Sequence, residues 1–298
     1  LALLDGGAGV DTLAFEESTI ANGTTLNLTT GGATNFENLR GSASNETLNG
    51  DNNDNILWGL GGDDTISGLG GDDILYAASS SMPGIGSGAS NQSGADNLYG
   101  GSGDDQLYGS AGNNLFDGGT GADTIATGDG NDTIVLRAGD GGSTLADADI
   151  ITDFSDGSDV LSMTGLGFSD FGIAQGVGSN TNHTILTNIS NGNYLAVLQN
   201  TSASKLTAAD FMSSSTNAQS FNGTSGNDGF VGGAGNDTFS TGTGTDEAYG
   251  HTGDDNFTVN GAGNKTISGG AGTDGLSIGY SGISGLDDFT ISSSGSSI

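Results

Sequence analysis

Aspartate recurs along this chain at a fixed place in a nine-residue period, and its neighbours suit it to hold metal ions. The period is G-G-x-G-x-D-x-U-x, where U is a large apolar residue, and it occurs 16 times in 298 residues. The sixth position is aspartate in 12 copies, where random placement of acidic residues would give about two. Glycines let the backbone turn tightly at positive φ and present carbonyl oxygens beside the carboxylate. Such hard oxygen ligands, in irregular arrangement, are those that Ca²⁺ prefers.

The predicted calcium ligands are the sixth-position side chains and the fourth-position glycines of the repeats, with each ion shared by successive turns on one edge. Carboxylates stacked at the rung spacing of roughly 4.8 Å would repel one another strongly without cations, so we favour ligation over simple surface charge. The sixth-position candidates are Asp11, Asp64, Asp73, Asp96, Asp105, Asp123, Asp132, Asp228, Asp237, Asp246, Asp255 and Asp274, with Asn55 and Asn114. The glycine candidates are Gly62, Gly71, Gly103, Gly112, Gly121, Gly130, Gly226, Gly235, Gly244 and Gly253.

Four repeats depart from aspartate at the sixth position, where they have Glu46, Asn55, Asn114 and Lys265. Glu46 and Asn55 keep an oxygen that can coordinate weakly. An ammonium group has no lone pair to offer, and it repels a metal cation. We therefore predict a missing or altered site between Asp246 and Lys265.

Short strands must position these turns. The residues that follow each aspartate, as in Thr238-Phe239-Ser240, are β-prone and have one apolar residue in the middle. This pattern predicts a three-residue strand whose apolar side chain points inward. A turn and a strand make half a coil, and two repeats make one coil. We therefore expect an all-β fold, a right-handed parallel β-roll (β-solenoid) of nonapeptide repeats, with two rolls separated by a β-rich cap.

The period also predicts the domain boundaries. Residues 1–40 form a strand-rich lead-in with one repeat, and residues 41–135 form the first roll, interrupted by a loop excursion at 77–90 that holds the only proline. The period is lost over 136–220, which we predict to be the cap, with a short helix starting at the capping-box spacing of Thr207 and Asp210. Residues 221–277 form the second roll, and 278–298 an incomplete strand region.

A further acidic segment follows the first roll and contains Asp149, Asp153, Asp156 and Asp159. These residues either form a cluster of turn-forming side chains, or Asp149 and Asp159 bind a further Ca²⁺ at the junction of roll and cap. The sequence leaves both interpretations open.

Charge and composition exclude several classes of protein. The chain has 4 lysine and arginine residues and a formal charge of −32. This balance excludes a nucleic-acid partner and binding to an anionic membrane surface. No apolar stretch is long enough to span a membrane. With 33% hydrophobic residues and no cysteine, so acidic a chain needs cations rather than disulfides to fold. No His-Glu-x-x-His or serine-nucleophile motif stands out, so we expect no enzyme activity.

The repeats resemble the repeats-in-toxin (RTX) family of calcium-binding β-rolls. The segment Asp149–Asp159 resembles the one that follows the roll in serralysin-like proteins, Leu206–Phe211 is similar to the terminal motif of that region, and Asn38–Ser42 resembles a common lead-in. The resemblance implies several bound Ca²⁺ ions as cofactors, passage through a type I secretion apparatus, and an extracellular location, secreted or at the cell surface.

Two functions fit this resemblance. The first is a calcium-binding structural region of a secreted bacterial surface protein (surface layer, adhesin or extracellular matrix), with self-assembly or a cell-surface partner, that folds on Ca²⁺ binding after export. The alternative is the C-terminal folding and secretion module of an extracellular RTX enzyme whose catalytic domain lies outside this chain. A carbohydrate-binding roll is a third reading. No secretory leader opens the sequence, and we interpret the chain as a fragment of a longer polypeptide.

Overall fold

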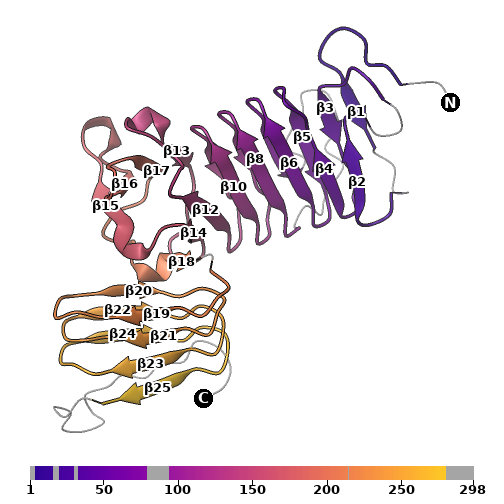
Figure 1. The fold of residues 1–298 in the computed structure, drawn as a ribbon. Coiled ribbons are helices and arrows are strands. Elements are labelled where there is room, and N and C mark those ends of the chain that lie inside the picture. Colours follow the sequence, from indigo (N-terminus) through magenta and orange to yellow (C-terminus); the bar gives the residue numbers. More distant parts are fainter. Residues whose placement is uncertain (1–3, 16–19, 30–32, 79–93, 214, 280–298) are drawn as a thin grey trace. The chain divides into compact units, whose positions relative to one another are not determined.

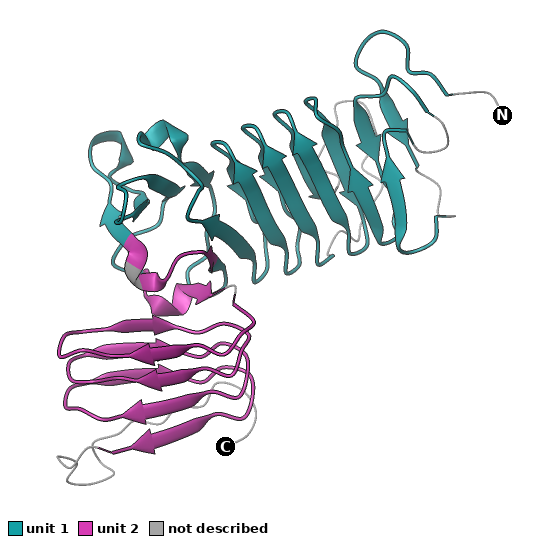
Figure 2. Ribbon diagram, in the orientation of Figure 1, with its two compact units in different colours: residues 1–161, 172–205 teal, residues 162–171, 206–298 magenta. Residues whose placement is uncertain are grey.

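Short, mainly parallel β-strands of three to six residues are the main secondary structure of the computed structural model, which describes residues 4–15, 20–29, 33–78, 94–213 and 215–279. The chain divides into two compact units, residues 1–161 with 172–205 (unit 1) and residues 162–171 with 206–298 (unit 2), coloured separately in Figure 2. The stacked parallel sheets confirm the predicted all-β roll. Among the described residues, no helix has the length and hydropathy that a membrane crossing requires.

Successive strands of unit 1 alternate between two parallel ladders, as the half-coil pattern predicts (Figure 1). One ladder contains β1 (Thr12–Ala14), β3 (Asn38–Arg40), β5 (Ile56–Leu60), β7 (Ile74–Ala78), β9 (Gln106–Tyr108), β11 (Thr124–Ala126) and β13 (Asp149–Ile151). The other contains β2 (Thr24–Asn27), β4 (Glu46–Asn49), β6 (Thr65–Gly70), β8 (Asn97–Ser102), β10 (Leu115–Thr120), β12 (Thr133–Arg137) and β14 (Val160–Thr164).

The register of these ladders places the apolar position of each repeat in the core. Leu57 pairs with Leu75, 18 residues later, and both are fully buried. Leu75 in turn pairs with Leu107, 32 residues later. The difference of 14 residues equals the length of the excursion predicted at 77–90, most of which lies outside the described residues. The stack therefore continues across the insertion without a change of register.

Antiparallel strands end the first ladder of unit 1. Strand β13 pairs in parallel with β17 (Tyr194–Leu198), which pairs antiparallel with β16 (Thr184–Asn188), and β15 (Phe171–Gln175) follows in the same sheet. Two short 3-10 helices, η2 (Leu145–Asp147) and η4 (Gly178–Asn180), lie in the connections of unit 1, and η3 (Phe168–Asp170) belongs to unit 2. A cap of this kind covers the backbone edge that the last coil of a solenoid would expose. The segment 136–220 predicted as the cap contributes residues to both units.

Unit 2 repeats the two-ladder arrangement with an aromatic core. Phe239 stacks on Phe221 and on Phe257, with ring centroids 4.9 and 4.6 Å apart. The predicted short helix is present as the 3-10 helix η5 (Ala208–Asp210), whose capping box pairs Thr207 with Asp210. The strands of the unit are β18 (Phe211–Ser213), β19 (Ser220–Asn222), β20 (Gly229–Val231), β21 (Thr238–Ser240), β22 (Asp246–Tyr249), β23 (Asn256–Val259), β24 (Lys265–Ser268) and β25 (Gly275–Ile278). Nearly all of the strand region predicted for 278–298 lies outside the described residues.

Candidate metal centres

The sixth-position side chains form continuous hydrogen-bonded rows along the edges of the rolls. At each step except those that lead to Asn55 and to Lys265, one carboxylate or amide oxygen accepts the backbone N–H of the sixth-position residue one coil earlier. Asp105 Oδ1, for example, accepts from Asp73 N at 2.7 Å, and Asp123 Oδ1 accepts from Asp105 N at 2.8 Å. One oxygen of each side chain is thereby used within the protein, and the other is left for a different partner.

There are two such rows in each unit, because successive repeats lie on opposite edges. In unit 1 one row runs through Asn55, Asp73, Asp105, Asp123 and Asp149, and the other through Glu46, Asp64, Asp96, Asn114, Asp132 and Asp159. Strand pairing places Glu37 between Asp11 and Asn55 at the start of the first row, and Glu37 Oε2 accepts from Asp11 N at 2.8 Å. In unit 2 one row runs through Asp237, Asp255 and Asp274, and the other through Asp228, Asp246 and Lys265.

The second carboxylate oxygen is buried in many of these residues without any hydrogen-bond donor. Within the described residues this holds for Oδ2 of seven aspartates, and a buried ionised oxygen without a partner is strongly unfavourable. A divalent cation would satisfy these atoms, which therefore fit the metal that the repeats imply. The seven are Asp11, Asp64, Asp73, Asp105, Asp123, Asp132 and Asp255.

Burial without a counter-ion also changes the acidity of these groups. The pKa of Asp64 is raised from 3.8 to about 8, mainly by desolvation; the backbone hydrogen bond from Glu46 opposes the shift, and the carboxylates of Asp96 and Glu46 add to it. Desolvation likewise raises the pKa of Asp73 and of Asp123 to about 7. Carboxyl groups shifted in this direction are those that a cation would return to the ionised form.

The first glycine of the repeat leaves room for the carboxylate. A Cβ on Gly59 would collide with Oδ2 of Asp64 and would approach the carbonyl oxygen of Ala77 to 2.8 Å. A Cβ on Gly232 would likewise collide with Oδ2 of Asp237 and lie 2.8 Å from the carbonyl oxygen of Gly250. Each carboxylate therefore lies beside a backbone carbonyl of the next coil, in a space that any side chain would fill.

The fourth-position glycines adopt the backbone conformation that the sequence predicts in eight of ten cases. Their φ angles are positive at Gly62, Gly71, Gly103, Gly112, Gly121, Gly130, Gly244 and Gly253, and Gly226 and Gly235 are the exceptions. A Cβ at Gly253 would collide with the carbonyl group of Gly235, one coil earlier. The carbonyl oxygens of these turns thus lie along the same edge as the carboxylates.

Where the sixth position is not aspartate, the unpartnered oxygen disappears. The amide nitrogen of Asn114 donates to the carbonyl oxygens of Gly112 and Ser110, at 3.2 and 3.4 Å. That of Asn55 donates to the carbonyl oxygen of Glu37 at 2.9 Å. Both carboxylate oxygens of Glu46 accept from Ser42. These three side chains therefore present internal hydrogen bonds rather than a free ligand atom.

The acidic segment after the first roll continues both rows. Asp149 Oδ1 accepts from Asp123 N at 3.0 Å, and Asp159 Oδ1 accepts from Asp132 N at 3.1 Å. Asp153 accepts from the backbone of Thr127 at 2.8 Å. Asp149 and Asp159 thus occupy sixth positions in the last coil of unit 1, although no nonapeptide leads into them.

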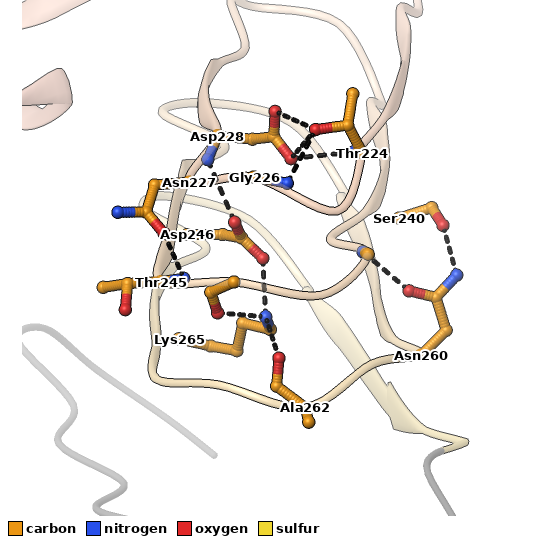
Figure 3. A network of polar contacts seen from close by, with 12 residues as sticks. Thr224, Gly226, Asn227, Asp228, Ser240, Thr245, Asp246, Asn260, Ala262 and Lys265 are labelled. Atoms are coloured by element: carbon orange, nitrogen blue, oxygen red, sulfur yellow. Dashed lines mark hydrogen bonds and ion pairs between the residues drawn. The ribbon is translucent and has the colours of Figure 1, made fainter.

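Other predicted ligands differ in how their second oxygen is used. Asp96 Oδ2 accepts from Ser110 Oγ at 3.2 Å, and Asp228 Oδ2 accepts from the backbone of Thr224 at 2.7 Å. Asp274, at the end of its row, is exposed. At the predicted altered site, the ammonium group of Lys265 lies 2.6 Å from Asp246 Oδ2 (Figure 3).

A second set of hydrogen-bonded rows, formed by the fifth-position side chains, was not predicted from the sequence. The fifth-position side chains accept the backbone N–H of the next coil, whereas the sixth-position side chains accept from the previous one. Asp72 Oδ1 accepts from Asp104 N at 3.0 Å, and Asn236 Oδ1 accepts from Asp254 N at 2.9 Å. The signal was available, because 11 of the 16 fifth positions are aspartate or asparagine.

The rows differ from a compact metal cluster. Within the part of the chain that the structure describes, no three side chains of histidine, cysteine, aspartate or glutamate come together to hold an ion. Each position along a row instead combines one carboxylate oxygen with backbone carbonyls of adjacent coils. Such an arrangement suits Ca²⁺, which accepts many oxygen ligands at variable geometry.

The repeats match a known family. The RTX calcium-binding nonapeptide repeat is found in four copies, at residues 40–77, 92–125, 108–141 and 222–257. Among solved structures, this chain is similar to the AlgE6R3 subunit of the Azotobacter vinelandii mannuronan C5-epimerase. The identity is 27%, the match covers 55% of this chain and 80% of that one, and the TM-score is 0.33. No curated protein matches the chain. The repeats of this chain belong to the RTX calcium-binding nonapeptide repeat family.

Proposed function

We propose that this chain is a non-catalytic structural region of a secreted bacterial surface protein, and that it folds when it binds several Ca²⁺ ions outside the cell. The observation that carries the proposal is the set of buried, unpartnered carboxylate oxygens along the edges of the rolls. Bound calcium would satisfy these oxygens and offset part of the formal charge of −32.

Binding and folding would then be one process. The residues that would hold each ion lie in different coils, so the site exists only when the coils are stacked. Asp105 and Asp123 illustrate this dependence, because each uses one oxygen to hold the coil before it. At low intracellular calcium the chain would stay unfolded, as passage through a type I secretion apparatus requires. Millimolar calcium outside the cell would favour the folded state by mass action.

Calcium titration of the chelated chain tests the coupling. The circular dichroism spectrum should change from that of a mainly disordered chain, in which part of unit 2 remains ordered, to that of a β-protein as calcium rises to millimolar concentrations. Magnesium, which demands octahedral geometry and dehydrates reluctantly, should be far less effective at equal concentration. A spectrum that is the same in EDTA and in calcium would contradict the proposal.

The surface role requires its own experiment. Antibodies against this chain should label intact producing cells, and an EDTA wash should release the labelled protein. Folded protein should also form assemblies in calcium that light scattering detects. Antigen found only in the culture medium, as monodisperse particles, would instead favour the alternative.

That alternative is a folding and secretion module of an extracellular RTX enzyme. It is supported by the segment around Asp149 and Asp159, whose spacing resembles the region after the roll in serralysin-like proteins. The gene's full reading frame separates the two proposals. A hydrolase or epimerase domain in the same polypeptide favours the enzyme module, and further rolls or adhesive domains favour the surface protein.

A further inference from the structure

Lys265 lies at the sixth position of its repeat, where its neighbours in the row have aspartate. All three of its ammonium donors have an oxygen partner: Asp246 Oδ2 at 2.6 Å, the carbonyl of Gly244 at 2.7 Å and the carbonyl of Ala262 at 3.3 Å (Figure 3). The side chains of Lys265 and Asp246 are 7% and 0% exposed. The ammonium group is thus enclosed by one carboxylate and two backbone carbonyls from two successive coils.

The other row of unit 2 offers the same set of atoms without a lysine. Asp255 is the counterpart of Asp246, and its Oδ2 is buried without a partner. The amide of Gly253 donates to the carbonyl oxygen of Ala271 at 2.9 Å, as the amide of Gly244 donates to that of Ala262 at 2.8 Å. The residue in the place of Lys265 is Asp274. The two positions therefore differ chiefly in whether a cation is built into the chain.

We propose that the Lys265 ammonium is a tethered cation that takes the place of one calcium ion, so that the position between Asp246 and Lys265 is satisfied without metal. This inference rests on the proposed calcium binding, because it states which position of the row does not take part. An ammonium group that uses its three donors on these oxygens leaves no ligand free for calcium, and its charge repels a second cation.

As a consequence, the contact between these two coils of the roll does not need calcium in order to form. At the row positions whose Oδ2 has no donor, removal of metal leaves buried carboxylates that repel one another. Between Asp246 and Lys265, removal of metal changes nothing, because the counter-ion is covalently attached. This coil can stay formed in chelator and present a stacking surface to its neighbours when calcium returns.

Stoichiometry measures the substitution directly. The full chain, its K265D variant and its K205D variant are dialysed against saturating calcium, and bound metal is determined by atomic emission. K265D restores a carboxylate and should bind one more Ca²⁺ per chain than the unchanged protein. Lys205 is exposed, so K205D makes the same change of charge outside the rows and should bind the unchanged number.

The outcomes separate this inference from the function on which it rests. If the unchanged chain binds no calcium, both are wrong. If it binds calcium and K265D gains no ion, the tethered-cation inference alone is wrong. A gain in both variants would also overturn it, because general charge would then be the cause.

Hydrogen exchange measured on the unchanged chain tests the same inference without relying on the folding of a variant. In EDTA, the amide of Gly244 should exchange about tenfold more slowly than that of Gly253, because only the first is held by a filled position. In calcium the two rates should be similar. In K265D without calcium, the advantage of Gly244 should disappear. Equal rates for the two amides of the unchanged chain in EDTA would contradict the inference.

Discussion

The two units differ in how the buried carboxylate oxygens of the same repeat are partnered. Among the described residues, unit 2 leaves one buried carboxylate oxygen without a partner, that of Asp255. Gly233 donates to Asp237, Lys265 donates to Asp246, and the half-buried Asp228 accepts from Thr224. Unit 1 leaves six, those of Asp11, Asp64, Asp73, Asp105, Asp123 and Asp132. The repeat motif alone therefore does not set the calcium requirement, since local donors can replace the ion.

The cores differ in the same direction. In unit 1 the inward position is mainly leucine or isoleucine, as at Leu57, Leu75 and Leu107. In unit 2 the rings of Phe221, Phe239 and Phe257 stack in one column, nearly parallel. Aromatic side chains bury more apolar area per residue and gain from stacking. Unit 2 thus combines fewer unpartnered charges with a larger apolar contribution from each repeat.

Calcium removal should give the largest difference between the units. In EDTA the backbone amides of β5, β7 and β9 should lose most of their protection from hydrogen exchange, because buried carboxylates of adjacent coils then repel one another. The amides of β21 and β23 should retain part of theirs. Exchange followed by mass spectrometry on peptides from each unit measures both. Equal loss in the two units would show that the unpartnered oxygens do not govern the calcium requirement.

Much of this organisation could be predicted from the sequence, because the nonapeptide fixes turn, strand and core in one pattern. The alternation of ladders follows directly from the period, and so does the continuation of the stack after the excursion, where Leu75 pairs with Leu107. The altered position at Lys265 was also predictable, because its charge has the wrong sign for a metal ligand. The lysine's contact with the carbonyl of Gly244, in the preceding coil, required coordinates.

Other features depend on contacts between distant segments that no local pattern encodes. Asp149 and Asp159 belong to the rows, but their places are set by pairing with Asp123 and Asp132 rather than by a repeat of their own. His251, at the second position of its repeat, is half-buried, with Nε2 2.6 Å from the carbonyl oxygen of Phe211. The second position of a repeat says nothing about which segment covers it.

A matched pair of aspartate-to-asparagine substitutions should give a smaller effect on calcium affinity and assign that effect to one carboxylate oxygen. Asp105→Asn keeps the Oδ1 that accepts from Asp73 N but removes the anionic Oδ2. It should raise the calcium concentration at the folding midpoint about tenfold, a change of about 1.4 kcal/mol. In EDTA its sign should reverse, and the variant should be more stable than the unchanged chain by about 1 kcal/mol, because a buried charge is lost.

Asp104→Asn is the control for that pair. Asp104 is exposed, and its Oδ1 accepts from Ala122 N at 2.8 Å, a bond that asparagine can also make. Its calcium midpoint should change little. Fluorescence of Trp58, the single tryptophan of the chain and a residue of unit 1, reports the transition. Equal effects of the two substitutions would mean that net charge, rather than the sixth-position oxygen, sets calcium affinity.

A change of pH in the absence of calcium should give the smallest effect on stability, and this effect should differ between the units. In unit 1, burial raises the pKa of Asp64 to about 8 and that of Asp73 to about 7, from 3.8. Groups with a raised pKa in the folded state stabilise it fully below about pH 4 and lose that contribution as the pH rises through 7 to 8. In EDTA the Trp58 fluorescence of unit 1 should therefore lie closer to that of the folded, calcium-bound chain at pH 5 than at pH 8.

The stability of unit 2 should change less with pH, because the titrations of two of its groups have opposite effects on folding. Burial raises the pKa of Asp255, which favours folding in acid, but burial also lowers the pKa of His251 below 6.5. A histidine with a lowered pKa stabilises the folded state above pH 6.5, and that contribution is lost as the pH falls. Hydrogen exchange of β21 and β23 at the same two pH values, corrected for intrinsic rates, measures the response. A gain in unit 2 as large as that in unit 1 would show that the difference between their carboxylate rows has no energetic consequence.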